Sequence, residues 1–321
     1  MKKEHELFED VIKKMMFNIS KSDLNRNDLP TWLFPPKEIS FKINVGVGDI
    51  ILAKYFVDSV KHYFEKIYIT PDRSLVAFYR NDKKEYYKFI DDMMSLLFNE
   101  SPYIVTQKPD PQTMYIRGDC MTFVNTIKRY GYRYNISDSN LRKYFVEKDF
   151  VSNKEYIVLS TKVRDVLYKD YKEFSSKFYD LINLLSTKYK IIVIGERRMD
   201  NTDELKMPIH KDYIFVIYDD IIKNVKNLVD YSIDEIGCHP DISLLKRDSA
   251  ILASSKLSIC LGDGGNYCWS SVIAPKTISM TTRNLCSPVL GELCKNNHTK
   301  IFNNYLYFES EIRLYSNIHL K

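Results

Sequence analysis

The stretch from residue 257 to residue 280 constrains the fold of this chain more than any other, and it reads LSICLGDGGNYCWSSVIAPKTISM. Its pattern predicts an apolar strand at Leu257–Leu261, a glycine turn, a short helix at Tyr267–Ile273 and a second apolar strand at Thr277–Met280. Two buried strands that follow one another across a helix run parallel in one sheet. The stretch therefore predicts an α/β fold with a parallel sheet.

The turn inside this stretch has the composition of an anion-binding loop. Glycines let a phosphate approach the backbone closely, and the helix that follows offers free N–H groups with partial positive charge. The candidate phosphate-binding residues are therefore Asp263, Gly264, Gly265 and Asn266. An ordinary α/β turn, in which the glycines satisfy backbone geometry alone, is the alternative interpretation.

A second unit of the same kind lies near the start of the chain. The pattern predicts a strand at Ile39–Val45, a turn at 46–49, a helix at Ile50–Phe64 and a strand at Lys66–Thr70 that ends at Pro71. Ligands of open α/β sheets bind beyond the carboxyl ends of the strands. Gly48 and Asp49 are therefore candidate site residues, and the alternative role for Asp49 is a helix N-cap.

The remaining patterns continue the α/β organisation. Further strands are predicted at 74–79, 103–106, 155–160, 190–194 and 213–217, with another open at 115–117, and helices at 84–98, 122–129, 170–187 and 242–253. Two consecutive series that part near 148–154 predict two Rossmann-like domains with a cleft between them, at 39–150 and 151–321. The N-terminal extension, 1–38, is predicted to hold a helix at 6–19 and an extended proline-rich segment at 29–36.

Basic residues follow the predicted strands of the second domain. Lys162 and Arg164 come after the strand at 155–160, and Arg197 comes after the strand at 190–194. At those positions they would border the same rim as the glycine turn, and cations beside a helix N-terminus suit a diphosphate. Taken singly, each of them is better interpreted as a solvated surface charge, so only their convergence on one rim points to a diphosphate.

Composition excludes several classes. The chain has 321 residues, 45% hydrophobic and 28% charged, with no apolar run near the ~20 residues of a membrane span and no secretory signal pattern, so a cytoplasmic globular protein is expected. The net charge of +5 is spread along the chain, so no nucleic acid partner is expected. Lysines of the extension leave peripheral membrane contact open, beside a solvated helix face.

No metal site is predicted from the sequence. The six cysteines form no CxxC pair, the grouping of Cys286, Cys294 and His298 has poor spacing for a metal, and no Asp-x-Asp pair occurs. A Walker sequence is also absent. Cys260, inside a predicted strand, is expected in the core. These observations predict a site that neutralises a diphosphate with backbone N–H groups and cations.

Three segments resemble the ADP-heptose:lipopolysaccharide heptosyltransferase family, glycosyltransferase family 9. Asn44–Ala53, NVGVGDIILA, is similar to the family's opening strand and Gly-Asp turn, and Tyr156–Leu159 with Ile191–Gly195 is similar to the first strands of its second domain. Ala253–Met280 resembles its Asp-Ser-Gly-Pro-x-His segment, with Gly264, Asn266 and Cys268 in place of the serine, proline and histidine.

The resemblance implies the GT-B architecture, two Rossmann-like domains facing each other across a cleft, with an acceptor-binding first domain and a nucleotide-sugar-binding second domain. It also implies a reaction without metal or cofactor, in which a nucleotide diphosphate sugar is the co-substrate and Asp49 acts on the acceptor. The leading hypothesis is therefore an inverting glycosyltransferase with a glycan or glycolipid acceptor. The alternatives are a nucleotide-sugar epimerase, a polysaccharide pyruvyl-type transferase, or a non-catalytic sugar- or nucleotide-binding relative.

Overall fold

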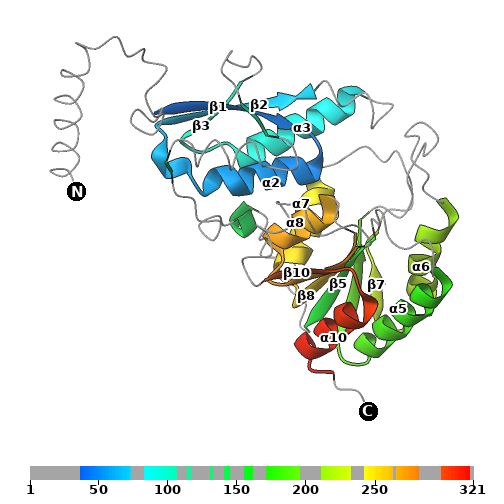
Figure 1. Ribbon diagram of the computed structural model, residues 1–321. Helices are drawn as coiled ribbons and strands as arrows, with labels where there is room; N and C mark the ends of the chain where they lie inside the picture. Colours follow the sequence, from blue (N-terminus) through cyan, green and yellow to red (C-terminus); the bar gives the residue numbers. More distant parts are fainter. Residues whose placement is uncertain are drawn as a thin grey trace, which may run out of the picture.

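A computed structural model of the chain describes residues 37–73, 83–106, 114–116, 131–132, 141–144, 155–161, 171–195, 211–232, 242–262, 265–281 and 298–318. Within these residues the chain forms two parallel sheets, each with helices packed against it (Figure 1). The predicted α/β class with two Rossmann-like sheets is confirmed.

Sheet 1 has the strand order β3-β2-β1-β4, and every neighbouring pair is parallel. Its strands are β1 (Glu38–Asn44), β2 (Lys66–Asp72), β3 (Tyr103–Val105) and β4 (Met114–Ile116). Alternate side chains of β1, Ile39, Phe41 and Ile43, are buried because they face the helices. The helices are α2 (Val47–Asp58) and α3 (Lys83–Leu97), and a short 3₁₀ turn, η3 (Lys61–Tyr63), follows α2.

Sheet 2 has the order β10-β9-β8-β5-β6-β7 and is parallel throughout. Its strands are β5 (Tyr156–Ser160), β6 (Lys190–Ile194), β7 (Leu228–Asp230), β8 (Leu257–Leu261), β9 (Thr277–Met280) and β10 (Thr299–Phe302). Its helices are α5 (Tyr171–Ser186), α6 (Lys211–Asn224), α7 (Ile242–Ala253), α8 (Gly265–Ile273) and α10 (Tyr305–Tyr315). The bounds of β6, α7, β8 and β9 are those predicted from the sequence.

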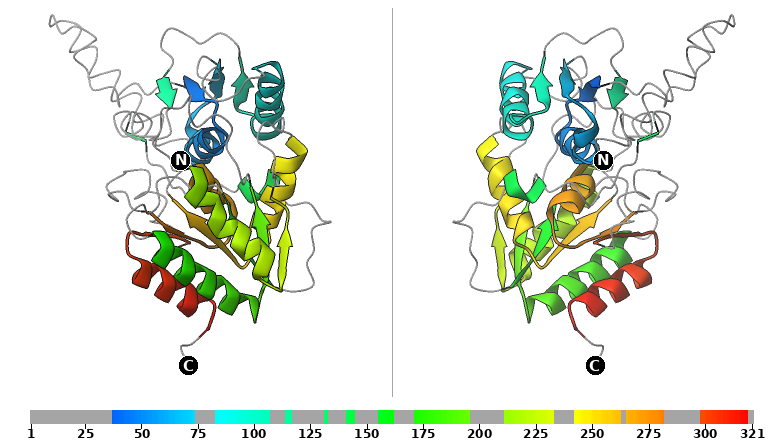
Figure 2. Two further views of the ribbon diagram at one scale, coloured as in Figure 1. Left: turned by 90° about the vertical axis from the view of Figure 1, so that its right-hand side faces the viewer. Right: turned by 90° about the vertical axis from the view of Figure 1, so that its left-hand side faces the viewer.

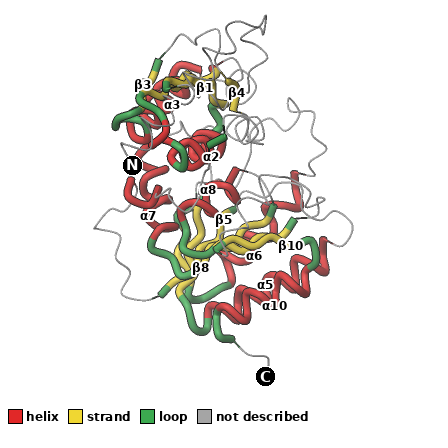
Figure 3. Tube along the Cα trace, turned by 60° about the vertical axis from the view of Figure 1, so that its left-hand side comes forward, coloured by secondary structure: helices red, strands yellow, loops and turns green. Residues whose placement is uncertain are grey.

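Sheet 2 separates two hydrophobic cores. Alternate strand residues such as Ile157 and Leu159 pack with α5, α6 and α10 on the outer face. The residues between them, such as Tyr156 and Val158, join a larger core that also contains α7, α8, α2 and α3. Figures 2 and 3 show the resulting layers, with α7 and α8 between sheet 2 and the helices of sheet 1. Both faces of this sheet are covered, as a continuously apolar parallel strand requires.

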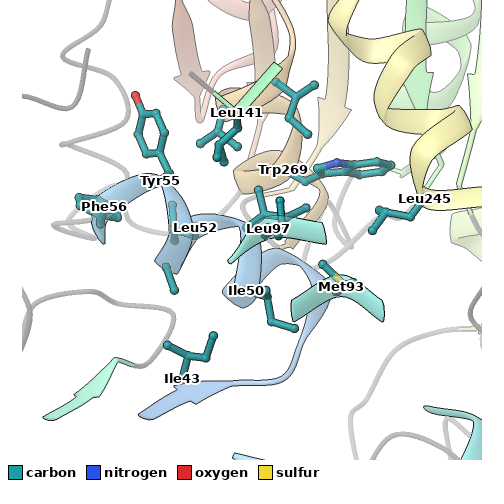
Figure 4. Packing of buried hydrophobic residues seen from close by; sticks show 14 of the residues in the cluster. Ile43, Ile50, Leu52, Tyr55, Phe56, Met93, Leu97, Leu141, Leu245 and Trp269 are labelled. Carbon is teal, nitrogen blue, oxygen red and sulfur yellow. The ribbon is translucent and has the colours of Figure 1, made fainter. Parts of the chain in front are cut away.

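Helix α2 lies at the centre of this arrangement. All nine residues from Ile50 to Asp58 are buried, because sheet 1 covers one side of the helix and α8 covers the other. The contact includes Ile50 and Leu52 of α2, Met93 and Leu97 of α3, and Trp269 of α8 (Figure 4). The indole Nε1 of Trp269 donates to Ser249 Oγ at 3.0 Å. The helices of the two sheets therefore share one continuous core.

Three sequence predictions need correction. The helix predicted at 50–64 begins earlier, at Val47, because extended Gly46 (φ −63°, ψ 140°) serves as its N-cap. It ends at Asp58, before the C-cap Ser59. Residues 213–217, predicted as a strand, belong to helix α6. Pro71 does not end β2, which continues to Asp72.

The position of Pro71 has a simple explanation. Ile67 and Ile69 form their backbone bonds toward β3, so the alternation of the strand turns the nitrogen of Pro71 to the same side. The β3 strand ends at Val105, opposite Ile69. The missing N–H of the proline therefore interrupts no ladder bond among the described residues.

Several predictions concern residues that the structure does not describe. The predicted helices at 6–19 and 122–129, the extended segment at 29–36, the strand at 74–79 and the boundary at 148–154 all lie outside the described residues. The domain limits stay predictions for the same reason. The expected burial of Cys260 is confirmed, since its side chain is 2% exposed. Strand β7, strand β10 and helix α10 are additions that the sequence patterns did not predict.

Candidate functional site

Each sheet has one topological switch point, a reversal where successive strands begin to be added on the opposite side of the first strand. In sheet 1, β1 lies between β2, which follows it, and β4, which joins from the opposite side. In sheet 2 the reversal lies between β5 and β8. Open α/β sheets leave a crevice at the carboxyl end of such a reversal, and ligands bind there. The turns after β1, β5 and β8 are therefore the candidate site of this protein.

The turn after β1 holds Asp49 through a defined set of contacts. Asp49 is the third residue of α2, since Gly46 is the N-cap, so the N-cap role considered for Asp49 is wrong. The side-chain amide of Asn44, the last residue of β1, donates from Nδ2 to Asp49 Oδ2 at 2.7 Å. Gly48 is the second residue of the same helical turn. A carboxylate in the first turn is also favoured by the partial positive charge of the helix N-terminus.

The turn after β8 begins at Gly262, whose backbone is held by two hydrogen bonds. Gly262 has φ 111°, a left-handed conformation that favours glycine. Its N–H donates to Met280 O at 2.6 Å, and its carbonyl accepts from Ser279 Oγ at 2.6 Å. Helix α8 begins at Gly265, two residues earlier than predicted, so the backbones of Gly265 and Asn266 form the helix N-terminus itself. The strand end before this turn is thus fixed by contacts with β9.

The end of β5 lies beside this turn and is polar. Ser160 pairs with Cys260 of β8 in the sheet register, and its side chain is fully buried. Its Oγ interacts with the buried thiol of Cys260, and it has no nitrogen or oxygen hydrogen-bond partner among the described residues. Its carbonyl accepts from the hydroxyl of Tyr218 at 3.0 Å. Thr161, which follows, is also buried.

A half-buried ion pair on α7 lies near the ends of β6 and β7. Arg247 Nη2 lies 2.7 Å from Asp248 Oδ1, and it also donates to the carbonyl of Tyr231 at 2.9 Å. Burial raises the pKa of Asp248 to about 6, although Arg247 and a hydrogen bond with the backbone of Gly195 oppose the shift. Gly195, with φ 99°, ends β6 in the same left-handed conformation as Gly262. Helix α7 is therefore tied to the carboxyl ends of β6 and β7.

The described residues include four of the predicted site residues. Asp49 and Gly48 lie in the first turn of α2, Gly265 and Asn266 in the first turn of α8, and these two helices pack against each other. The other predicted site residues lie outside the described residues: Lys162, Arg164, Arg197, Asp263 and Gly264. Sequence reasoning missed Asn44 and the Arg247–Asp248 pair. A polar residue at a strand end, and an acid among the apolar residues of α7, were the signals available.

The described residues contain neither a cluster of metal-binding side chains nor a membrane-spanning helix. No three or more His, Cys, Asp or Glu side chains gather there as ligands for a metal ion. The Cys286 and Cys294 of the grouping considered from the sequence lie outside this part of the chain. No helix within the described ranges has the length and apolar character needed to cross a membrane.

No protein-family model and no curated protein matches the sequence of this chain. The structure is similar to E. coli heptosyltransferase WaaC with ADP, at 9% identity and a TM-score of 0.47 over 87% of this chain and 99% of that chain. E. coli ADP-heptose lps heptosyltransferase II is similar at 9% identity and a TM-score of 0.45, over 88% of this chain and 99% of that chain.

A glycosyl transferase family 9 protein from Veillonella parvula is similar at 10% identity and a TM-score of 0.44, over 91% of this chain and 94% of that chain. These solved structures are glycosyltransferases, and they include heptosyltransferases, the family that the sequence motifs resemble. At such identities and TM-scores, the activity of this chain has to be argued from its own residues.

Proposed function

We propose that this protein is a glycosyltransferase that moves a sugar from a nucleotide diphosphate sugar to a hydroxyl group of a glycan or glycolipid. One observation carries the proposal. The two polar turns lie at the reversal points of the two sheets, and the helices that begin at them, α2 and α8, are packed together in one core. The end of β1 and the end of β8 are thereby connected through helices that share one hydrophobic core.

Asp49 is the general base of the proposed reaction. Its carboxylate takes the proton from the acceptor hydroxyl as that oxygen attacks the anomeric carbon of the donor. The bond between this carbon and the diphosphate oxygen breaks, and its electron pair leaves with the diphosphate. Attack from the side opposite the leaving group inverts the anomeric configuration. The half-buried position of Asp49 beyond the carboxyl end of β1 supports this role.

The turn after β8 is the proposed diphosphate site. Backbone N–H groups at the start of α8 would bind the phosphate oxygens, and the end of β5, next to β8 in the sheet, would border the bound diphosphate. Lys162, Arg164, Arg197 and the Asp263–Gly264 turn are proposed to complete the site. Cations and N–H groups of this kind would stabilise the charge of the departing diphosphate without a metal ion. Cytoplasmic residence, a role in polysaccharide synthesis and membrane contact remain predictions.

The first test is donor binding. Purified protein would be heated with a panel of nucleotide diphosphate sugars, in the presence and absence of EDTA. Stabilisation by one nucleotide family that EDTA does not reduce supports a metal-independent donor site and identifies the base. If no member of the panel shifts the melting temperature, the donor site is refuted and the turn after β8 is an ordinary α/β turn.

The second test is the product. Incubation with the stabilising donor and a panel of glycan acceptors, followed by mass analysis, would show the added mass of a glycosyl group. A pyruvyl group adds a different mass, and an epimerase leaves the acceptor unchanged while it converts the donor. Donor binding with no change in donor or acceptor would instead favour a non-catalytic binding protein.

A further inference from the structure

We propose that Asn44 is a positioning residue for Asp49, and that its side-chain amide fixes the carboxylate in the orientation in which it accepts the proton of the acceptor. This inference deepens the proposed function and rests on it. Asn44 is the last residue of β1, at the reversal point of sheet 1, whereas Asp49 belongs to helix α2. The contact between them therefore joins the strand end to the helix start.

The orientation of the Asn44 amide is determined by two hydrogen bonds. Its Oδ1 accepts from the backbone N–H of Val45 at 2.9 Å, and its Nδ2 donates to Asp49 Oδ2 at 2.7 Å. The reversed amide would direct an oxygen at the carboxylate and an NH₂ group at the Val45 N–H, so both contacts would be repulsive. The backbone thus holds the amide with its donor toward Asp49.

Gly46 makes room for this contact. A Cβ atom at position 46 would lie 2.7 Å from Asp49 Oδ2, far inside van der Waals distance. The carboxylate of Asp49 therefore folds back over the N-cap, where only a glycine leaves it space. The carbonyl of Val45, next to Gly46, accepts from the hydroxyl of Tyr86 at 2.9 Å, which ties this turn to helix α3.

The amide has two chemical consequences for Asp49. It sets the plane of the carboxylate, and proton transfer depends on that direction. It also donates to the charged form, which favours the ionised carboxylate over the protonated acid. Loss of the amide should therefore lower turnover and make the carboxylate retain its proton to higher pH.

Two variants separate these effects from a loss of structure. Asn44→Asp retains an acceptor for the Val45 N–H but replaces the donor with a negative charge, and Asn44→Ala removes both contacts. We expect kcat to fall about 10- to 100-fold in each, with an unchanged Kd for the donor. The acid limb of the pH–rate profile should move up by about one pH unit in Asn44→Ala and further in Asn44→Asp.

Asn227→Ala is the matched control. The Asn227 side chain donates to the carbonyls of Ser186 and Tyr189, at the edge of sheet 2 where β7 begins. Its removal also deletes an amide with two backbone contacts, but at a distance from the turns after β1 and β8. It should lower the melting temperature and leave the acid limb of the pH–rate profile in place.

The titration of Asp49 supplies a readout that needs no turnover. Carbon-13 NMR of the Asp49 carboxyl, assigned by its absence in Asp49→Asn, should show a higher titration midpoint in Asn44→Ala than in the wild type. An unchanged midpoint, or a lowered kcat with an unmoved acid limb, overturns the positioning role while the proposed function stands. If the wild-type protein transfers no sugar, the proposed function is overturned instead. The NMR comparison still shows whether the Asn44 amide favours the ionised form of Asp49.

Discussion

The two ends of helix α2 carry polar clusters that differ in burial and in the charge of their partners. At its start, Asp49 is half-buried at the edge where the strands of sheet 1 end, and it contacts the neutral amide of Asn44. At the other end, Lys54 and Asp58 are buried, and they pair with each other at 2.8 Å. The second cluster faces the edge where β2 and β3 begin, which is not where α/β sheets bind ligands.

The buried cluster is partnered on every side. Lys54 Nζ lies 3.7 Å from Glu100 Oε1 and 4.0 Å from the centroid of the Tyr103 ring. Burial lowers the pKa of Lys54, and Asp58 and Glu100 act in the opposite direction. The hydroxyl of Tyr144, from the 3₁₀ turn η6 (Leu141–Tyr144), bonds to Glu100 and so ties this turn to the first sheet.

The charges at the C-terminal end of α2 hold the structure together, whereas Asp49 lies where ligands of α/β sheets bind. Ions that are buried with complete sets of partners cannot receive a substrate, whereas a half-buried carboxylate at a strand end can. A buried ion pair is costly to disrupt, because removal of one partner leaves the other unpaired in a medium of low polarity. The following variants test the two ends of α2 against each other.

Asp49→Asn should have the largest effect, and on turnover alone. The amide cannot take the proton of the acceptor, so kcat should fall by about 10²- to 10⁴-fold while the Kd for the donor and the melting temperature are retained. Steady-state kinetics and donor titration measure the two quantities. Asp180→Asn, an exposed residue of α5, is the matched control. Unimpaired turnover of Asp49→Asn would remove the base role.

Lys54→Met should show the opposite behaviour, a loss of stability with little direct effect on chemistry. Methionine fills the space but leaves the buried Asp58 with the half-exposed Lys61, 3.7 Å away, as its remaining cation, so we expect a loss of up to about 3–5 kcal/mol in the free energy of unfolding. Urea denaturation measures it. The control is Lys37→Met, whose pair with Glu65 is exposed (78% and 63%) and should be worth less than about 1 kcal/mol. Equal losses in both variants would contradict the comparison.

Asp248 combines features of the two ends of α2. It lies near the carboxyl end of β6, but it is buried like Lys54 and Asp58. Its pKa of about 6 exceeds the ordinary value of 3.8, so the folded state binds this proton more tightly than the unfolded chain does. The ionised side chain therefore costs stability at neutral pH, and this cost is lost as the pH falls through about 6 toward 4.

The test is to compare Asp248→Asn with the wild type by urea denaturation. The stability of the variant relative to the wild type should be greater at about pH 7 than at about pH 4, by up to about 3 kcal/mol. A difference that does not change with pH would show that the Asp248 carboxyl titrates alike in the folded and unfolded chain.

Gly46→Ala should have the smallest effect and should act through Asp49. The backbone of Gly46 suits an alanine, and the Asp49 side chain can rotate away from the new methyl group, so the stability should change by less than about 1 kcal/mol. The displaced carboxylate should lower kcat about tenfold. In the double variant with Asp49→Asn the two losses should not add; additive losses would mean that Gly46 acts by another route.

Much of the fold could be predicted from local patterns. The strands β6, β8 and β9 are continuous apolar runs bounded by turns, which is the pattern of parallel strands covered on both faces, and α7 is bounded as its pattern indicates. The apolar run at 213–217 misled, because a short run of aromatic and β-branched residues fits a strand as well as a helix. Packing of Tyr218, Ile221 and Val225 on the outer core selects the helix.

Local sequence patterns predict the α/β class, most strand positions and the polar turns after β1 and β8, because these depend on the period of side chains and on glycine at tight turns. Tertiary structure decided which turns lie at reversal points, since strand order is a long-range property. It also decided that Asn44 meets Asp49 and that Lys54 meets Glu100, because contacts between a strand end or loop and a helix depend on how the helix packs.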